Sequence, residues 1–235
     1  MNDIAANLAR IHETIATAAR AADRSPDDIR LIAVSKGHPL PALEKAIAAG
    51  QRRFGENTMQ ESLQKISSLT EHPIEWHFIG HLQSNKAKLL PSNFAWLHSL
   101  DSLNLAERIS RFAREKNTTV DALIEVNVTG DRQKHGIAPD RLQPLLDQLL
   151  RQNLPGVRLR GLTTIGPHPA EEREIRAAFS LLRGLRDAAA QRFGLNRFTE
   201  LSMGMSGDYI EAIKEGATMI RIGTAIFGER SYAKV

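Results

Sequence analysis

The sequence contains no cysteine, so disulfide bonds and thiolate chemistry are excluded. Aromatic residues make up only 5% of the chain, and the basic residues are scattered along it. Nucleic-acid binding through a basic, aromatic-rich surface is therefore not expected. No apolar stretch approaches the ~20 residues that span a bilayer, and the first residues lack the segments of a signal peptide. We expect a cytoplasmic protein that binds neither nucleic acid nor membrane.

The rest of the composition is that of an ordinary globular protein. The chain has 235 residues, of which 42% are apolar and 25% are charged. We expect a single domain over residues 1–235, acting as a monomer, because single α/β barrels commonly have this length. The formal net charge of +4 allows an anionic ligand.

Eight short apolar runs predict buried β-strands, and helical segments separate them. The strands are expected at residues 31–36, 53–57, 74–80, 94–100, 122–128, 157–165, 199–203 and 218–222. The helices are expected at residues 3–22, 40–49, 58–68, 83–90, 103–116, 139–152, 170–193 and 207–215. This order predicts a single (β/α)8 TIM barrel, an α/β fold, with an extra N-terminal helix. The runner-up is an open doubly wound sheet.

The run Leu31-Ile32-Ala33-Val34-Ser35-Lys36 ends in a lysine at the expected carboxyl end of the first strand. Folds of this class collect their chemistry at these ends. A partly desolvated lysine there can lose its proton, attack an aldehyde and form a Schiff base. The alternative is a solvated lysine that only ends the strand, and this run alone leaves both open.

In a barrel, the polar residues at the carboxyl ends of the strands converge on one mouth. These residues are Lys36, Glu56, Asn57, His77, Gly80, His98, Asn127, Thr164, the segment 202–206, Arg221, Gly223 and Thr224. They comprise one candidate nucleophile, several neutral donors and a cation. We expect a ligand-binding mouth without a metal, because the histidines lack the spacing of a zinc site.

Two loops have the composition of an anion-binding site. Met203-Gly204-Met205-Ser206-Gly207 leads into a helix, and Gly223-Thr224 follows the eighth strand. Backbone N–H groups at helix starts attract anions, and barrels often bind phosphate after strands seven and eight. Together the loops indicate a phosphate group, although either one alone fits an ordinary cap or turn.

Arg221 alternates with Met219 and Gly223 in the expected eighth strand, so the three share one face. An arginine that points into a barrel mouth needs an acceptor. A pyridine nitrogen is one such acceptor, and a neighbouring carboxylate is another. The sequence leaves both open.

With these features in place, the chain resembles the pyridoxal phosphate homeostasis proteins, which are similar to the barrel domain of alanine racemase. Two positions depart from the family pattern, because Gly37 replaces a threonine and His81 replaces a proline. The matching segments cover nearly the whole chain: AVSK at 33–36, FGEN at 54–57 with 60–61, WHFIG at 76–80 with LQSNK at 82–86, RGL at 160–162, LSMGMS at 201–206 with Asp208, and RIGTAIFG at 221–228.

The resemblance implies that Lys36 carries pyridoxal 5′-phosphate (PLP) as a Schiff base. It implies phosphate contacts from Ser206, Gly223 and Thr224, and it places Arg221 against the pyridine nitrogen. It also implies that Asn57 lines the ring and that Met203 and His77 pack near it.

The resemblance also bears on catalysis. Arginine stays protonated, so Arg221 leaves the ring nitrogen without a proton and makes the cofactor a weaker electron sink. Racemases bring a tyrosine from a second domain, which we do not expect here because Val235 directly follows the eighth unit. Neither tyrosine, Tyr209 or Tyr232, ends an expected strand.

We therefore expect a PLP carrier in vitamin B6 and amino- and keto-acid homeostasis, with no catalytic residues assigned. Its expected partners are PLP, free amino acids and apo-enzymes that require PLP. The alternative is an enzyme with weak amino-acid racemase activity.

Overall fold

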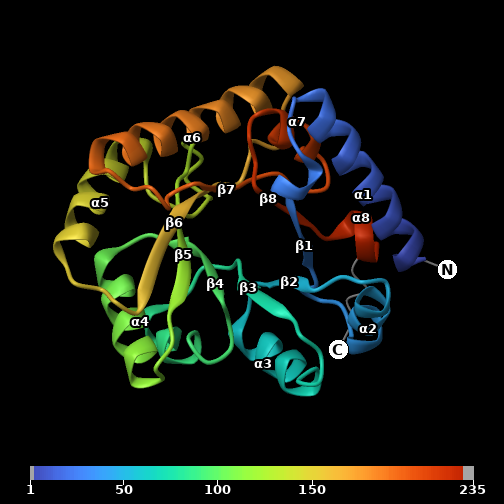
Figure 1. The fold of residues 1–235 in the computed structure, drawn as a ribbon, viewed down its shortest axis with the longest axis horizontal. Helices are drawn as coiled ribbons and strands as arrows, with labels where there is room; N and C mark the ends of the chain where they lie inside the picture. The colour runs from blue at the N-terminus through green and yellow to red at the C-terminus, as the bar shows by residue number, and fades with distance from the viewer. Residues whose placement is uncertain (1–2, 230–235) are drawn as a thin grey trace.

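The computed structural model describes residues 3–229, and eight strands within them form a closed barrel (Figure 1). The strands are parallel and follow one another around the barrel in chain order, and β8 pairs back onto β1. The (β/α)8 barrel is thereby confirmed, and the open sheet is excluded. The strands are β1 (Arg30–Val34), β2 (Arg53–Glu56), β3 (Glu75–Phe78), β4 (Trp96–Leu100), β5 (Val120–Glu125), β6 (Val157–Thr163), β7 (Glu200–Ser202) and β8 (Met219–Ile222).

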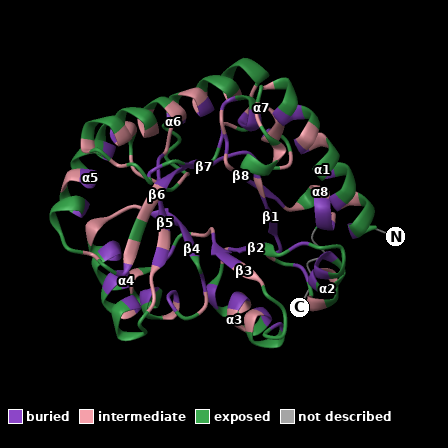
Figure 2. Cartoon of the chain, in the orientation of Figure 1, coloured by how far each residue is buried: buried purple, intermediate pink, exposed green. Residues whose placement is uncertain are grey.

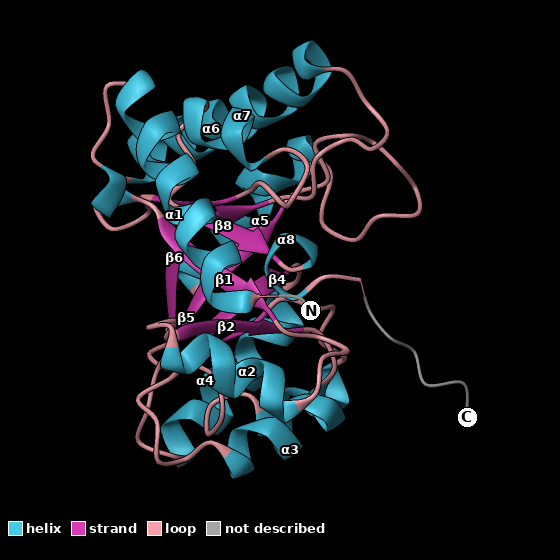
Figure 3. Cartoon of the chain, turned by 90° about the vertical axis from the view of Figure 1, so that its right-hand side faces the viewer, coloured by secondary structure: helices cyan, strands magenta, loops and turns pink. Residues whose placement is uncertain are grey.

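The helices lie on the outside of the barrel (Figures 1 and 3). The α-helices are α1 (Ile4–Ala21), α2 (Leu40–Ala48), α3 (Met59–Ser68), α4 (Leu103–Glu115), α5 (Leu142–Arg151), α6 (Glu172–Phe193), α7 (Tyr209–Lys214) and α8 (Thr224–Phe227). The described part of the chain also contains the 3₁₀ helices η1 (Pro26–Asp28), η2 (Ser84–Leu89) and η3 (Pro139–Arg141). The helix expected at 83–90 is thus a 3₁₀ helix, because six residues before Pro91 leave little room for α-helical hydrogen bonds.

The extra N-terminal helix α1 completes the outer layer. Its N-cap, Asp3, accepts a hydrogen bond from the N–H of Ala6 at 3.0 Å. Its buried face includes Leu8, Ile11 and Ile15 at helical spacing. α1 packs against α2, α7 and α8. Since α8 has only four residues, α1 covers the barrel where a longer eighth helix would otherwise lie. No helix within residues 3–229 is long and apolar enough to cross a bilayer.

The apolar core lies mainly between the strands and the helices, where the buried residues gather (Figure 2). Inside the barrel, a separate apolar cluster contains only Ile32, Trp96, Leu123 and Met219. Side chains alternate in direction along each strand, so the next inward positions lie one layer above or below this cluster. Many of those positions are polar, and they form the site and the barrel floor described below.

Candidate ligand-binding site at the barrel mouth

A cavity of about 1000 Å³ lies at the carboxyl ends of the strands. Its wall contains six of the eight residues predicted for the site, which are Lys36, Asn57, Ser206, Arg221, Gly223 and Thr224. They come from the segments after β1, β2 and β7, from β8 itself and from the start of α8. The barrel therefore brings together residues that are up to 188 positions apart in the sequence (36 to 224).

Lys36 lies two residues beyond β1 and is half-buried in the cavity wall. The ladder continues to Ser35, whose N–H donates to the carbonyl of Gly55 at 3.0 Å. Gly37 then has a φ of +74°, in the left-handed region that favours glycine. The chain thus turns away directly after Lys36, which leaves this lysine in the cavity wall instead of open solvent.

An ionic group, here called the Lys65 cluster, consists of the buried Glu56 and Lys65 and the partly exposed Glu61. Lys65 Nζ lies 2.7 Å from Glu56 Oε1 and 2.6 Å from Glu61 Oε1. Burial raises the pKa of Glu56, and the charge and hydrogen bond of Lys65 oppose this rise. The sequence analysis did not predict this cluster. The i,i+4 spacing of Glu61 and Lys65 on α3 was a signal for part of it.

The Lys65 cluster holds both chain neighbours of Lys36. Lys65 Nζ donates to the carbonyl of Ser35 at 2.7 Å. The Ser35 hydroxyl donates to the carboxylate of Glu56 at 2.6 Å. The N–H of Gly37 donates to the carboxylate of Glu61 at 2.7 Å. Gly37, one of the two departures from the family pattern, therefore still has its backbone N–H held. The cluster fixes the backbone that presents Lys36 to the cavity.

Asn57 reaches the cavity because β2 and β3 approach closely at their ends. A Cβ atom placed on Gly80 would lie 2.2 Å from the carbonyl oxygen of Asn57, so any larger residue there would displace Asn57. His81 follows Gly80 and also lines the cavity. Its ring stacks on His135 with centroids 4.5 Å apart. His81, the second departure, thus extends the rim of the site.

The two predicted anion loops lie next to each other. Ser206 Oγ accepts a hydrogen bond from the N–H of Ala225 at 3.4 Å, which joins the loop after β7 to the start of α8. Gly204 has a φ of +95°, and its loop is closed by Asp208, whose carboxylate accepts the N–H of Met205 at 2.5 Å. The two loops therefore form one edge of the cavity.

Arg221 points inward from β8 and is 6% exposed. Its Nη1 donates to Ser202 Oγ at 2.6 Å and to Thr163 Oγ1 at 3.1 Å, and its Nη2 donates to the carbonyl of Thr164 at 2.7 Å. Within residues 3–229, no carboxylate forms an ion pair with it. Burial lowers the pKa of Arg221, while Glu125 and Asp208 raise it. An arginine nevertheless stays protonated.

Two predicted residues do not reach the cavity, and strand geometry explains both. His77 is inward-facing and fully buried, but Ile79, two residues later on the same face, is the one that lines the cavity. Met203 follows the inward-facing Ser202 and therefore points outward, into the core between strands and helices. The structure thus places His77 one layer below the cavity and Met203 behind the barrel wall.

Glu125 lies in the cavity wall where the sequence analysis placed Asn127. β5 ends at Glu125, and Asn127 turns into the following loop, where its Nδ2 donates to the carbonyl of Asp131 at 2.8 Å. Glu125 is 8% exposed, and burial raises the pKa of its carboxyl group, although Arg221 and His135 oppose the rise. Strict alternation from Leu123 was a signal that could have identified it.

A bulge in β6 decides which of two neighbouring threonines faces the cavity. Ala122 of β5 pairs with Leu159 of β6, but Leu123 pairs with Gly161, so Arg160 is an extra residue. The alternation of β6 therefore shifts by one position. Thr163 lines the cavity, while Thr164, the residue named by the sequence analysis, is buried and donates from Oγ1 to the carbonyl of Val126 at 2.6 Å.

The cavity thus combines a lysine amine, two loops that offer backbone and hydroxyl donors, and a buried guanidinium. This set suits an anionic ligand that carries a carbonyl group and an acceptor atom. Tyr209 begins α7 and does not end a strand, whereas Tyr232 lies outside the described residues. Among residues 3–229, no group of three or more histidine, aspartate and glutamate side chains is arranged to hold a metal ion.

Known proteins are similar to this chain in sequence and fold. Residues 6–231 match the family model of the alanine racemase N-terminal domain. The chain is 46% identical over 233 residues to the pyridoxal phosphate homeostasis protein of Pseudomonas aeruginosa. The aligned region covers 99% of this chain and 98% of that protein. The corresponding protein of Escherichia coli K12 is 43% identical over 238 residues and is covered completely, as is this chain.

Among solved structures, PipY of Synechococcus elongatus with PLP bound has a TM-score of 0.84 and 40% identity, over 96% of this chain and 100% of that chain. The sequence and the fold agree, and both extend over nearly the whole of each protein. This chain therefore belongs to the pyridoxal phosphate homeostasis protein family, and its barrel is an alanine racemase N-terminal domain.

Proposed function

We propose that this protein binds PLP in the mouth cavity through Lys36 and serves vitamin B6 and amino- and keto-acid homeostasis without strong catalytic turnover. The observation that carries the proposal is that Lys36, both anion loops and Arg221 face one cavity. The names of the relatives and the PLP bound to PipY support it.

The residues of the cavity fit PLP in size and charge. A volume of about 1000 Å³ is at the upper end of the common range for small-molecule sites. Ser206, Gly223 and Thr224 would hold the phosphate at the edge formed by the two loops. Of the five guanidinium hydrogens of Arg221, three have acceptors among residues 3–229, so two are available to an acceptor on the ligand.

When bound, PLP supplies an aldehyde that condenses with a primary amine. Lys36 provides that amine, and the Lys65 cluster fixes its position in the cavity wall. Arg221 would donate a hydrogen bond to the ring nitrogen and would keep its own proton, because a guanidinium does not readily release one. The protein would therefore hold the cofactor while limiting its capacity to withdraw electrons. Free amino acids would enter by the same mouth, and apo-enzymes would be the acceptors of cofactor released from it.

The test is covalent trapping. Protein incubated with PLP and reduced with borohydride should carry one pyridoxyl group on the peptide that contains Lys36, as measured by mass spectrometry. Lys36→Arg keeps the charge but lacks the reactive amine, so it should carry none. A pyridoxyl group on other lysines only, or no uptake from excess PLP, would overturn the proposal.

One observation favours a second candidate, a weak amino-acid racemase. Racemisation needs an acid or base on each face of the substrate, and Glu125 lines the same cavity as Lys36. β5 lies four strands from β1 in the closed barrel of eight, so the two residues reach the mouth from opposite sides. Glu125 would then exchange a proton at Cα on the face that Lys36 does not reach.

The two candidates differ in what they do to an amino acid. A carrier incubated with L-alanine in deuterated water should at most incorporate deuterium at Cα with retention of configuration. A racemase should produce D-alanine, and Glu125→Gln should abolish that product while leaving trapping at Lys36 intact. Chiral chromatography with mass detection separates these outcomes.

A further inference from the structure

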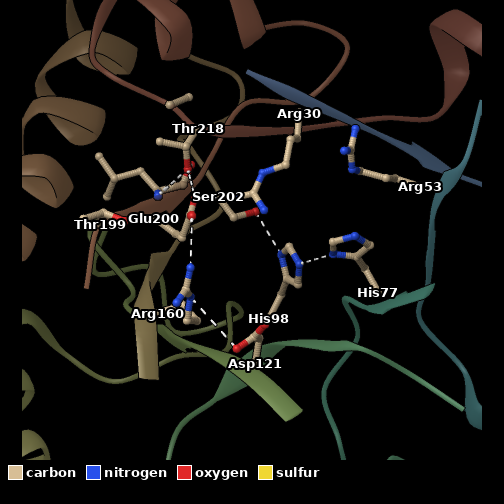
Figure 4. A network of polar contacts seen from close by, with 12 residues as sticks. Arg30, Arg53, His77, His98, Asp121, Arg160, Thr199, Glu200, Ser202 and Thr218 are labelled. Atoms are coloured by element: carbon tan, nitrogen blue, oxygen red, sulfur yellow. Dashed lines mark hydrogen bonds and ion pairs between the residues drawn. The ribbon is translucent and has the colours of Figure 1, made fainter. Parts of the chain in front are cut away.

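A continuous line of hydrogen bonds crosses the barrel interior from the mouth to the opposite end. Arg221 Nη1 lies 2.6 Å from Ser202 Oγ, and Ser202 Oγ lies 2.9 Å from His98 Nδ1. His98 Nε2 lies 2.9 Å from His77 Nδ1, and His77 Nε2 lies 3.0 Å from Glu75 Oε1. Figure 4 shows His98 between Ser202 and His77. The five residues come from β8, β7, β4 and β3.

The chemistry of the two ends gives this line one direction. A guanidinium can only donate, so Ser202 Oγ accepts from Arg221 and its own hydrogen is free to go to His98 Nδ1. A neutral His98 then carries its hydrogen on Nε2 and donates it to His77 Nδ1. His77 in turn carries its hydrogen on Nε2 and donates it to the carboxylate of Glu75.

The reverse assignment pairs fewer groups at both ends. A hydrogen on His98 Nδ1 would give Ser202 Oγ two donors and leave the serine hydrogen without its histidine acceptor. A hydrogen on His77 Nδ1 would turn the Nε2 lone pair toward the negative oxygen of Glu75. Both rings are buried, at 0% and 2% exposure, and burial lowers the pKa of each histidine, which agrees with neutral rings. One tautomer of each histidine therefore satisfies the whole line.

We propose that Ser202, His98 and His77 are positioning residues that connect the carboxylate of Glu75 to Arg221 and hold its guanidinium in the mouth cavity. The line takes up one Nη1 hydrogen, while Thr163 and Thr164 take up two others. The plane of the guanidinium is thereby set, and its two remaining hydrogens have a fixed direction. Only the last step, from a fixed Arg221 to the ligand ring, rests on the proposed function.

A neighbouring polar group on the barrel floor provides a matched control. Thr218 Oγ1 donates to Glu200 Oε2 at 2.6 Å, and Glu200 also contacts Arg30 and Arg160 (Figure 4). Within the described residues, this group forms no hydrogen bond with Arg221 or His98. Thr218→Val should therefore affect stability without affecting the guanidinium.

The first experiment uses the cofactor-free protein and is independent of PLP binding. Nuclear magnetic resonance of ¹⁵N-labelled histidines at pH 7 should show His77 and His98 as neutral rings with the hydrogen on Nε2. A hydrogen on Nδ1 of either ring, or a protonated ring, would overturn the proposed direction even if the protein binds PLP.

The second experiment compares two substitutions of His98. In His98→Asn, Oδ1 takes the approximate place of Nδ1 and still accepts from Ser202, whereas His98→Leu removes the acceptor. We expect His98→Leu to weaken PLP retention about tenfold, as for the loss of one buried hydrogen bond, and to shift the absorption band of bound PLP. His98→Asn should give an intermediate loss of both properties, because it keeps the acceptor for Ser202 but loses the link to His77. Inorganic phosphate should bind all variants equally.

Several results of these measurements would overturn the proposal. Equal PLP affinity and spectrum in His98→Leu and the unsubstituted protein would overturn the positioning role. So would a spectral shift of the same size in Thr218→Val, which would indicate a general packing effect. If His98→Leu does not fold, Ser202→Ala breaks the same line from the other side and should give the same shift. Failure of the unsubstituted protein to bind PLP would overturn the proposed function. The histidine tautomers would still test the direction of the line of hydrogen bonds.

Discussion

Lys65 donates a hydrogen bond from its buried ammonium to the backbone carbonyl of Ser35, with 2.7 Å between Nζ and O. Ser35 directly precedes Lys36, so a cation on α3 holds the backbone from which the lysine of the cavity projects. The same ammonium also neutralises Glu56, which is fully buried. The position of the reactive amine and the stability of the barrel edge therefore depend on one side chain.

We expect Lys65→Met to destabilise the fold by about 3–5 kcal/mol, because it leaves the buried carboxyl of Glu56 without its cation. Trapping of PLP at Lys36 should also slow. The double substitution Lys65→Met with Glu56→Gln also removes the unpaired carboxylate of Glu56, so it should recover part of the lost stability. Urea unfolding measures the free energies. A cost below about 1 kcal/mol for the single variant would contradict the role of the cluster.

We expect Gly204→Ala to be costly and Gly207→Ala to be tolerated, although both lie in the same loop. Gly204 has a φ of +95°, and a Cβ there would lie 2.6 Å from Cβ of Ala212, whereas a Cβ at Gly207 would meet no atom within 4 Å. The first change should cost about 1–3 kcal/mol and the second less than about 0.5 kcal/mol. Thermal unfolding of both variants tests this, and equal costs would show that the loop is not held as described.

We expect Ser206→Ala and Thr224→Ala each to weaken PLP retention by about 1.5–3 kcal/mol, because each removes a hydrogen bond to a charged phosphate. Ser67→Ala is the matched control, since it removes an exposed hydroxyl on α3. Equilibrium dialysis against PLP gives the dissociation constants. Unchanged affinity in both site variants would mean that the phosphate lies elsewhere in the cavity.

The carboxyl of Glu125 should make stability depend on pH with a definite sign. Burial raises its pKa above the ordinary value of 4.5, so the folded protein binds this proton more tightly than the unfolded chain. Its contribution is complete below the unfolded pKa and is lost as the pH rises through the folded pKa. The unfolding free energy of Glu125→Gln should therefore increase relative to the unsubstituted protein from pH 4 to pH 8. A constant or decreasing difference would show that Glu125 is not desolvated.

The alternation of short apolar runs with helical segments was sufficient to predict the barrel, because strand and helix periodicities are local properties of the chain. The same reasoning located Lys36 after the first strand and both loops after the last two. The polar ends of parallel strands must meet at one mouth, so Asn57, Ser206, Arg221, Gly223 and Thr224 could be assigned to a single site before any contact was known.

The tertiary structure decided which side chains face the cavity wherever local periodicity was not enough to predict it. The bulge at Arg160 arises from the pairing of β5 with β6, and it turned Thr163 inward instead of Thr164. The end of β5 selected Glu125 over Asn127. The line of hydrogen bonds joins His98 to Ser202, which are 104 residues apart in the sequence, and no pattern in the sequence indicates that contact. Register, strand ends and burial depend on partners that are distant in the chain, so they appear only when the barrel closes.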